Sequence, residues 1–238
     1  MPQRFEELAW RSTPIGEISL RRRHDPVVDV EVYEVKLDDG FLMSSLFTVA
    51  EVELARRGLA ALDGDGLHVV VGGLGLGYTA TTVLADPRVR SLLVVDALEE
   101  VIGWHQRGLL PFAATLRTDD RCRLVHGDFF ALTADPAGYH PDQPGQPVHA
   151  VLVDIDHSPR HLLHPGHAPF YTPDGLRRLA RHLRPGGVFG LWSNDPPDAE
   201  FTAVLADVFA TARAEVVQFD NPLQRRTSAN TIYLAQTG

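Results

Sequence analysis

Three glycines follow an apolar segment in the stretch VVVGGLGLGYTA, residues 69–80. Gly73, Gly75 and Gly77 alternate with other residues, and Gly75, Gly77 and Ala80 also fit the spacing G-x-G-x-x-[GA]. Glycine adopts positive φ and lets a ligand approach the backbone, and a helix that follows offers free N–H groups at its start. The spacing predicts a nucleotide-like ligand at this turn, with tight local packing as the alternative.

An acidic residue, Asp96, ends the next apolar segment, about 20 residues after the glycines. A carboxylate at this position can accept hydrogen bonds from both ribose hydroxyls of a bound nucleoside. The combination does not separate NAD from a nucleoside sulfonium such as S-adenosylmethionine (AdoMet), because both ligands carry an adenosine ribose.

Acidic residues also follow two later apolar segments. Asp128 has Phe129 beside it, and the pair can hold an adenine through its exocyclic amine and its ring. Asp154 and Asp156 follow HAVLV. A free alkylamine has a pKa near roughly 10, so such a carboxylate can hold the ammonium and accept its proton. His157 is a further candidate base, and the alternative is that Asp154 and Asp156 only cap the loop.

Histidines crowd the loop that begins at His157. They are His157, His161, His164 and His167. Their spacing would suit one helix, but Pro159 and Pro165 interrupt it. A metal site needs three or four converging ligands, so we expect no metal here.

Alternating apolar and amphipathic segments must position these residues. The expected strands are 67–72, 91–96, 122–126, 148–154 and 187–192, and the expected helices are 78–85, 98–107, 173–183 and 198–211. Strands that read as near-continuous apolar runs are typical of a parallel sheet covered by helices. Segments 214–220 and 230–236 are joined too closely for a parallel crossover and should pair antiparallel. The prediction is an α/β, Rossmann-like, mostly parallel sheet with one antiparallel strand near its end.

Residues 1–60 differ from the rest. The segments GEISLRRR and VDVEVYEVKLDDGFLMSSL are rich in β-branched residues and are separated by turn residues, which predicts a small antiparallel β unit. The segment TVAEVELARRGLAAL then has helical spacing. Two domains are expected: residues 1–60, with the β unit and a connecting helix, and residues 61–238, with the nucleoside site.

The composition of the chain limits which binding partners and which cellular compartment are expected. The chain has 238 residues, a formal charge of −9 and a single cysteine, Cys122. Nucleic-acid binding usually needs a basic face, so no nucleic-acid partner is expected. The acidic balance suits a small cationic substrate, or serves solubility alone. The absence of a disulfide, of a signal-peptide pattern and of a membrane-length apolar segment predicts a cytoplasmic protein.

Together these motifs resemble the spermidine-synthase-like proteins, the polyamine aminopropyltransferases of the class I AdoMet-dependent methyltransferase superfamily. The segments that carry the resemblance are LDDGFLMSS, GGLGLG, VVDALEEVI, GDFF, LVDIDHSP, FYTPDGL and LRPGGV. The resemblance implies polyamine biosynthesis, by transfer of an aminopropyl group from decarboxylated AdoMet to an amine. It places Gly73–Gly77 at the sulfonium side chain, Asp96 at the ribose, Asp128 at the adenine and Asp154 as the catalytic acidic residue. It also implies a homodimer formed through the N-terminal β unit.

The sequence departs from that family at positions that bear on donor and acceptor. The family turn reads G-G-G-D-G-G, and Gly75 stands where its Asp meets the aminopropyl amine. The second Asp of the family's D-x-x-D-P is displaced to Asp156 or replaced by His157, and Met43 or Ser44 stands near the family's glutamine. Without the turn Asp, the carboxylate of intact AdoMet would be tolerated, so a methyltransferase of small molecules is the first alternative. A non-catalytic nucleoside-binding homologue and an NAD(P)-dependent oxidoreductase are the others.

Overall fold

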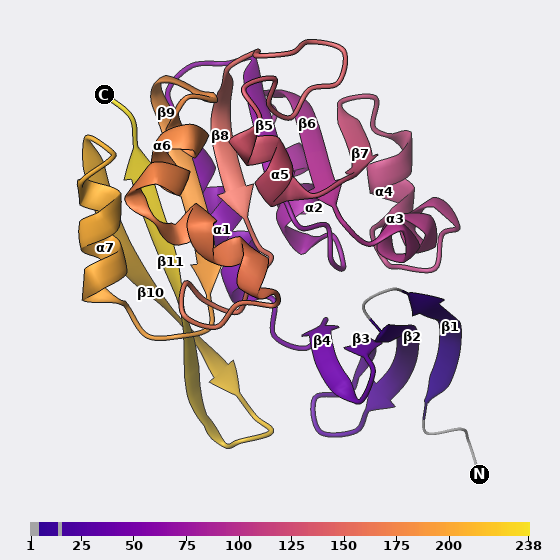
Figure 1. Ribbon diagram of the computed structural model, residues 1–238. Coiled ribbons are helices and arrows are strands. Elements are labelled where there is room, and N and C mark those ends of the chain that lie inside the picture. Colours follow the sequence, from indigo (N-terminus) through magenta and orange to yellow (C-terminus); the bar gives the residue numbers. More distant parts are fainter. Residues whose placement is uncertain (1–4, 14–15) are drawn as a thin grey trace.

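The computed structural model describes residues 5–13 and 16–238, and it contains two separate β-sheets. Figure 1 shows the smaller sheet, drawn in indigo, below the larger sheet, at the edge where the parallel strands of the larger sheet end. Among the described residues, no helix has the length and apolar character needed to cross a membrane.

The smaller sheet is the predicted N-terminal β unit. Its strands are β1 (Glu6–Thr13), β2 (Gly16–Asp25), β3 (Val30–Leu37) and β4 (Gly40–Ser44), all antiparallel and in that order. Strand β1 was not predicted, because apolar and polar residues do not alternate in EELAWRST. In the structure its pairing with β2 shifts register between Glu7 and Ala9. Residues 1–4 and 14–15 of the predicted unit lie outside the described residues.

The larger sheet has seven strands in the order β10-β11-β9-β8-β5-β6-β7. They are β5 (Leu67–Gly72), β6 (Val89–Asp96), β7 (Cys122–His126), β8 (Val148–Val153), β9 (Leu183–Ser193), β10 (Thr211–Asn221) and β11 (Arg226–Gln236). Strand β11 runs antiparallel to both of its neighbours, and β5 to β9 are mutually parallel. The predicted mostly parallel sheet with an antiparallel strand near the end is confirmed.

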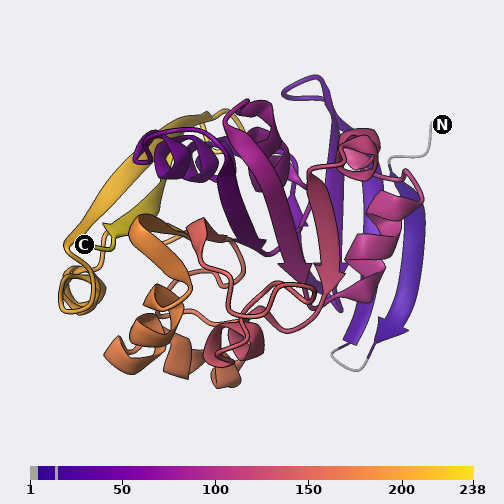
Figure 2. The same ribbon diagram turned by 90° about the horizontal axis from the view of Figure 1, so that it is seen from above.

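Helices cover both faces of this sheet (Figure 2). One face carries α1 (Val49–Ala60), α2 (Tyr78–Ala85), α3 (Glu99–Gln106) and α4 (Ala113–Thr118). The other carries α5 (Phe129–Ala134), the 3-10 helix η1 (Pro165–Tyr171), α6 (Pro173–Ala180) and α7 (Ala199–Ala206). Helices α4, α5 and η1 were not predicted, because six or seven residues are too few to show helical periodicity.

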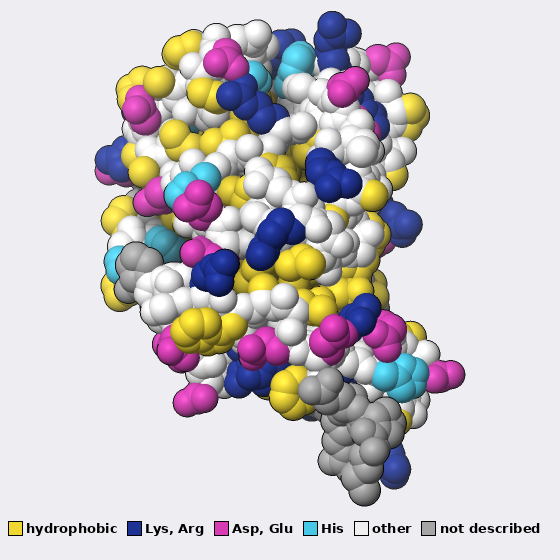
Figure 3. Space-filling view, turned by 90° about the vertical axis from the view of Figure 1, so that its right-hand side faces the viewer, with side chains coloured by type: hydrophobic (Ala, Val, Ile, Leu, Met, Phe, Trp, Pro, Cys, Tyr) yellow, Lys and Arg dark blue, Asp and Glu magenta, His cyan; other side chains and the backbone are white. Residues whose placement is uncertain are grey.

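The two sheets share one apolar core. The core on the α1 face includes Ile18, Leu20 and Val35 of the smaller sheet together with Leu54 of α1 and Leu152 of β8, all fully buried. Helix α1, expected as a connection, therefore packs as a covering helix of the larger sheet. In Figure 3 hydrophobic side chains gather at the waist between the lower sheet and the body above it.

Candidate active site

The glycine turn has a backbone that other residues adopt only with strain. Gly73, Gly75 and Gly77 have φ of +92°, +49° and +94°. A Cβ on Gly73 would lie 2.1 Å from the carbonyl oxygen of Asp154, so the turn packs directly against the end of β8. Glycine is needed at Gly73 both for its φ and for this contact.

Asp96 ties the turn to the end of β6. Its Oδ2 accepts a hydrogen bond from the N–H of Leu74 at 2.8 Å, and its Oδ1 accepts one from Leu98 at 2.8 Å. Burial raises the pKa of Asp96, and the N–H groups of Leu98, Leu74 and Gly75 oppose that rise. The side chain is half-buried at the carboxyl edge. It therefore braces the turn, and its contact with a ribose stays a prediction.

A buried histidine of α3 contacts the glycine turn. His105 of α3 is 1% exposed, and its Nε2 lies 2.9 Å from the carbonyl oxygen of Gly75. Burial lowers the pKa of His105, so the neutral ring donates from Nε2. Sequence reasoning passed over this residue, although position 105 shares the buried face of α3 with Val101 and Ile102.

Asp154 stands beside the turn, where β8 ends. Its Oδ2 lies 3.2 Å from the Oγ1 of Thr79 in the first turn of α2. Burial raises the pKa of Asp154 to about 6, and the hydroxyl of Thr79 opposes the rise. The carboxyl can therefore change its protonation state near neutral pH, as a proton acceptor must.

A second carboxyl, Glu51, faces Asp154 from the first turn of α1. Its Oε2 is buried and has no hydrogen-bond partner among the described residues. Burial, and then the charge of Asp154, raise the pKa of Glu51 to about 8. Thr79 joins the two elements, since its Oγ1 also lies 3.3 Å from the carbonyl oxygen of Glu51. At neutral pH Glu51 holds a proton, and Asp154 carries most of the pair's negative charge.

Glu51 was missed from the sequence. The available signal was its place on the buried face of α1, which it shares with Leu54 and Ala55. A charged residue on the apolar face of a helix needs a partner or a function.

Asp156 is placed differently from Asp154. It is 1% exposed, and its carboxylate is fully engaged inside the loop that follows β8. Its Oδ1 accepts from the N–H of Leu163 at 2.7 Å and lies 2.8 Å from Nδ1 of His167, while its Oδ2 accepts from the hydroxyl of Tyr171 at 2.8 Å. The structure does not bring Asp156 to Asp154, because these contacts direct its carboxylate into the loop. The neighbouring His157 is exposed.

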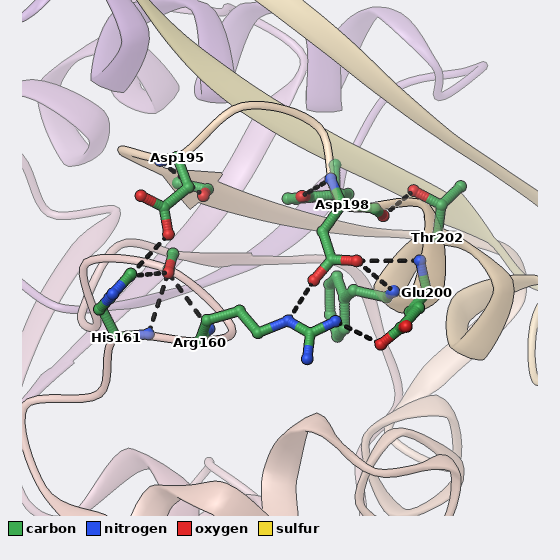
Figure 4. Close-up of polar contacts among 10 residues, drawn as sticks. Arg160, His161, Asp195, Asp198, Glu200 and Thr202 are labelled. Carbon is green, nitrogen blue, oxygen red and sulfur yellow. Dashed lines mark hydrogen bonds and ion pairs between the residues drawn. The ribbon is translucent and has the colours of Figure 1, made fainter.

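Polar contacts, two of them ion pairs of Arg160, fasten this loop to the segment that follows β9 (Figure 4). His161 Nδ1 lies 2.7 Å from Oδ2 of Asp195, and Nε of Arg160 lies 2.6 Å from Oδ2 of Asp198. Arg160 also contacts Glu200 at 2.5 Å. The hydrogen bond from Arg160 lowers the pKa of Asp198. These contacts hold the loop next to the end of β8.

The side chains of Asp128 and Phe129 lie in different surroundings. Asp128 caps α5, with its Oδ1 accepting from the N–H groups of Phe130 and Ala131, and it lines an open cavity of about 270 Å³. Phe129 is 2% exposed and packs against Tyr139 and beneath Gly72. The ring of Phe129 therefore belongs to the core and does not present a face to a ligand. The adenine contact predicted for Asp128 stays a prediction.

The smaller sheet closes one side of the glycine turn. A Cβ built on Gly75 would lie 3.3 Å from Sδ of Met43 in β4. Met43, which stands near the family's glutamine position, thus lies next to Gly75, which stands at the family's Asp position. Within residues 5–13 and 16–238, no three His, Cys, Asp or Glu side chains form a group that could hold a metal ion.

Several solved structures have the same fold as this chain. The protein aligns with the crystal structure of spermidine synthase from Thermotoga maritima at a TM-score of 0.73 and 15% identity, over 98% of this chain and 73% of that chain. A spermidine synthase in complex with the transition-state analogue AdoDATO aligns at 0.72 and 15% identity, over 98% and 72%. The chain has the spermidine-synthase fold. Since these alignments cover nearly the whole chain, the fold includes both sheets.

The spermidine-synthase fold is a form of the class I methyltransferase fold. Human methyltransferase-like protein 13 in complex with SAH aligns at a TM-score of 0.58 and 19% identity, over 79% of this chain and 82% of that chain. No protein-family model and no curated protein matches the sequence.

Proposed function

We propose that this protein is an aminopropyltransferase, which moves the aminopropyl group of decarboxylated AdoMet onto an amine acceptor. The fold supports a sulfonium-dependent transferase, because solved proteins of this fold include spermidine synthases and a methyltransferase-like protein. At 15–19% identity the likeness shows the fold, and the choice of donor rests on the residues of the site.

The observation that carries the choice of donor is the carboxyl pair beside the glycine turn. Gly73 packs against the backbone of Asp154, and Glu51 faces Asp154, so a sulfonium side chain held by Gly73–Gly77 would lie near this pair. The single negative charge of the pair, carried mostly by Asp154, would repel the carboxylate of intact AdoMet, whereas it would attract the ammonium of a decarboxylated donor or of an acceptor. The pair therefore offers the negative group that Gly75 lacks.

The reaction needs alignment and one proton transfer. The neutral nitrogen of the acceptor attacks the methylene carbon next to the sulfonium sulfur, and the carbon–sulfur bond breaks. Its electron pair stays on sulfur, which leaves methylthioadenosine. Asp154 takes the proton of the acceptor ammonium, and Glu51, already protonated, keeps the site from holding two negative charges. Alignment by the turn and this proton transfer are the two contributions the chain must supply.

The ligand test is calorimetric titration with decarboxylated AdoMet, AdoMet, methylthioadenosine and NAD. We expect tighter binding of decarboxylated AdoMet than of AdoMet, and binding of methylthioadenosine. Preference for intact AdoMet would instead support a methyltransferase, which the glycine at Gly75 favours. Binding of NAD alone would overturn the nucleoside-sulfonium assignment.

Replacing the base tests the mechanism. Asp154→Asn should lower kcat by about 100- to 10,000-fold, the usual contribution of a general base, while methylthioadenosine binds as in the wild type. Because the base must be ionised, kcat/KM of the wild type should fall below a midpoint near the pKa of about 6 at Asp154. His157→Gln is the control, since its side chain is exposed, and it should keep full activity. Full activity of Asp154→Asn would assign the base elsewhere.

A further inference from the structure

The hairpin of β10 and β11 extends past the end of β9. The last residue of β9, Ser193, pairs with Thr231, so residues 226–230 of β11 continue beyond the parallel strands. Figure 1 shows the tip of this hairpin, in yellow, on the same side of the larger sheet as the N-terminal strands. An open cavity of about 540 Å³ lies against the hairpin, and Phe47, just before α1, is among its lining residues.

The cavity lies at the same end of the sheet as the proposed reaction centre, and Trp192 of its lining packs against the α1-face core that contains Leu152 of β8. Val153 pairs with Leu191 and Trp192 pairs with Ile232, so the end of β8, Trp192 and β11 are level across the sheet. Neighbouring strands lie about 4.8 Å apart, which puts Ile232 of β11 about 10 Å to the side of Asp154, and Arg226 lies six residues from Ile232 toward the tip of the hairpin. Helix α1 begins two residues after Phe47 and carries Glu51 in its first turn. An elongated acceptor held at Asp154 can therefore extend toward the hairpin.

The lining chemistry is neutral or positive. Asn194, Asn221 and Asn230 contribute amides, Phe219 packs at 5.6 Å from the Phe47 ring, and none of the described lining residues is acidic. The indole Nε1 of Trp192 is buried and has no partner among the described residues.

Arg226 provides the only charge of the lining among the described residues. Its Nε donates to Oε1 of Gln224 at 2.7 Å, and in the described part of the chain its guanidinium has no carboxylate partner. In the register of the hairpin, Arg226 pairs with Asn221 and Ser228 pairs with Phe219, so these side chains share the face of the hairpin that lines the cavity. A guanidinium that has no carboxylate partner among the described residues, in a cavity whose described lining has no carboxylates, disfavours a second ammonium and favours an anion.

We propose that this cavity binds the remote end of the acceptor, and that the acceptor is an elongated primary amine with an anionic group at that end. The amine would lie at Asp154, and the anion would pair with Arg226. The proposal rests on the proposed function for the position of the amine, and it differs from a diamine acceptor only at the remote end.

The test compares two acceptors of equal length, 8-aminooctanoate and 1,8-diaminooctane, by calorimetric titration in the presence of methylthioadenosine. We expect the wild type to bind the amino acid about tenfold more tightly than the diamine, the effect of one charge-assisted contact. Arg226→Gln should remove this preference, and Arg226→Glu should reverse it. Arg225→Gln is the matched control, since Arg225 lies next in the turn but does not line the cavity, and it should bind like the wild type.

Equal or tighter binding of the diamine to the wild type would overturn the proposal, and so would no binding of the amino acid. An unchanged preference in Arg226→Glu would overturn it too. These outcomes are separate from the proposed reaction, which is judged by donor binding and by the mass of the product. A wild type that prefers the diamine and still transfers an aminopropyl group would refute the acceptor class and leave the function intact.

Discussion

At the scale of single residues, the pairing of Glu51 with Asp154 sets the chemistry of the candidate site. Burial places both pKa values within or close to the physiological range, at about 8 and about 6. Because the two carboxyls interact, their protons leave in two steps that belong to the pair. One proton retained between them gives a site that can receive another from a substrate.

The pair should also leave a signature in stability. The pKa of Glu51 is raised to about 8 in the fold, so between about pH 4.3 and pH 8 the folded state binds a proton that the unfolded state releases. Stability from this group is fully present below about pH 4.3 and is lost as pH rises through 8. Glu51→Gln removes this titration, so the stability of the variant relative to the wild type should increase as pH rises. At pH 8 its Tm should be higher by at least about 2 °C, equivalent to roughly 1 kcal/mol.

Thermal unfolding followed by circular dichroism between pH 5 and pH 8 measures this difference. Glu53→Gln is the control, because Glu53 lies in the same helix but pairs with Arg57 at 2.9 Å. A difference between Glu51→Gln and the wild type that does not grow with pH would contradict the raised pKa.

At the scale of elements, the glycine turn and the loop after β8 depend on each other. Gly73 meets the carbonyl of Asp154, so the turn and the end of β8 constrain each other at the base of the Asp154 side chain. Asp156 then gathers Leu163, His167 and Tyr171 around one buried carboxylate. Asp156 thus holds its own loop together, whereas the sequence alone admitted it as a second base.

Adding one methyl group tests the turn. Gly73→Ala should destabilise the protein strongly, because its Cβ would lie 2.1 Å from a backbone oxygen and its φ is +92°. Gly66→Ala is the matched control, with a φ of +72° and no heavy atom within 4 Å of the added Cβ. It should cost only about 1–2 kcal/mol of backbone strain in urea denaturation. Equal losses in the two variants would show that the Asp154 contact does not constrain the turn.

Removing the carboxylate tests the loop. Asp156→Ala leaves its donors unsatisfied, at about 1–3 kcal/mol for each buried group, whereas Tyr171→Phe removes a single hydrogen bond worth about 1 kcal/mol. Hydrogen exchange should rise across residues 156–171 in Asp156→Ala and rise much less in Tyr171→Phe. Similar exchange in both variants would contradict the central role of Asp156.

At the scale of the whole molecule, the smaller sheet and the larger one pack around a shared apolar core. Buried residues of β2 and β3 belong to the same core as α1 and β8. Met43 of β4 also reaches the glycine turn. The smaller sheet therefore contributes one wall of the candidate site.

Unfolding should accordingly be one transition. Trp10 lies in the smaller sheet, while Trp104 and Trp192 lie in the larger domain. In the double variant Trp104→Phe/Trp192→Phe, Trp10 is the remaining tryptophan. We expect the urea transition measured by its fluorescence to coincide with the transition of the same variant measured by circular dichroism. An earlier fluorescence transition would show that the smaller sheet unfolds separately.

The sequence by itself determined most of the main elements and the edge of the sheet at which the candidate site lies. Apolar runs such as LLVVD and HAVLVD must be buried on both faces, so they predict parallel strands and place Asp96 and Asp154 where strands end. The strands 67–72 and 122–126 and the helix 78–85 form with the predicted bounds. These features depend on local patterns that are read along the chain.

Only the tertiary structure decided which side chains meet at that edge. Glu51 and Asp154 are about a hundred residues apart, and packing of α1 over β8 brings them together. Asp156 follows Asp154 by two positions, yet the contacts of its loop turn it into the interior. Phe129 follows Asp128 directly, but its ring packs in the apolar core against Gly72. The direction of a side chain depends on partners that are distant in sequence, and no local spacing specifies them.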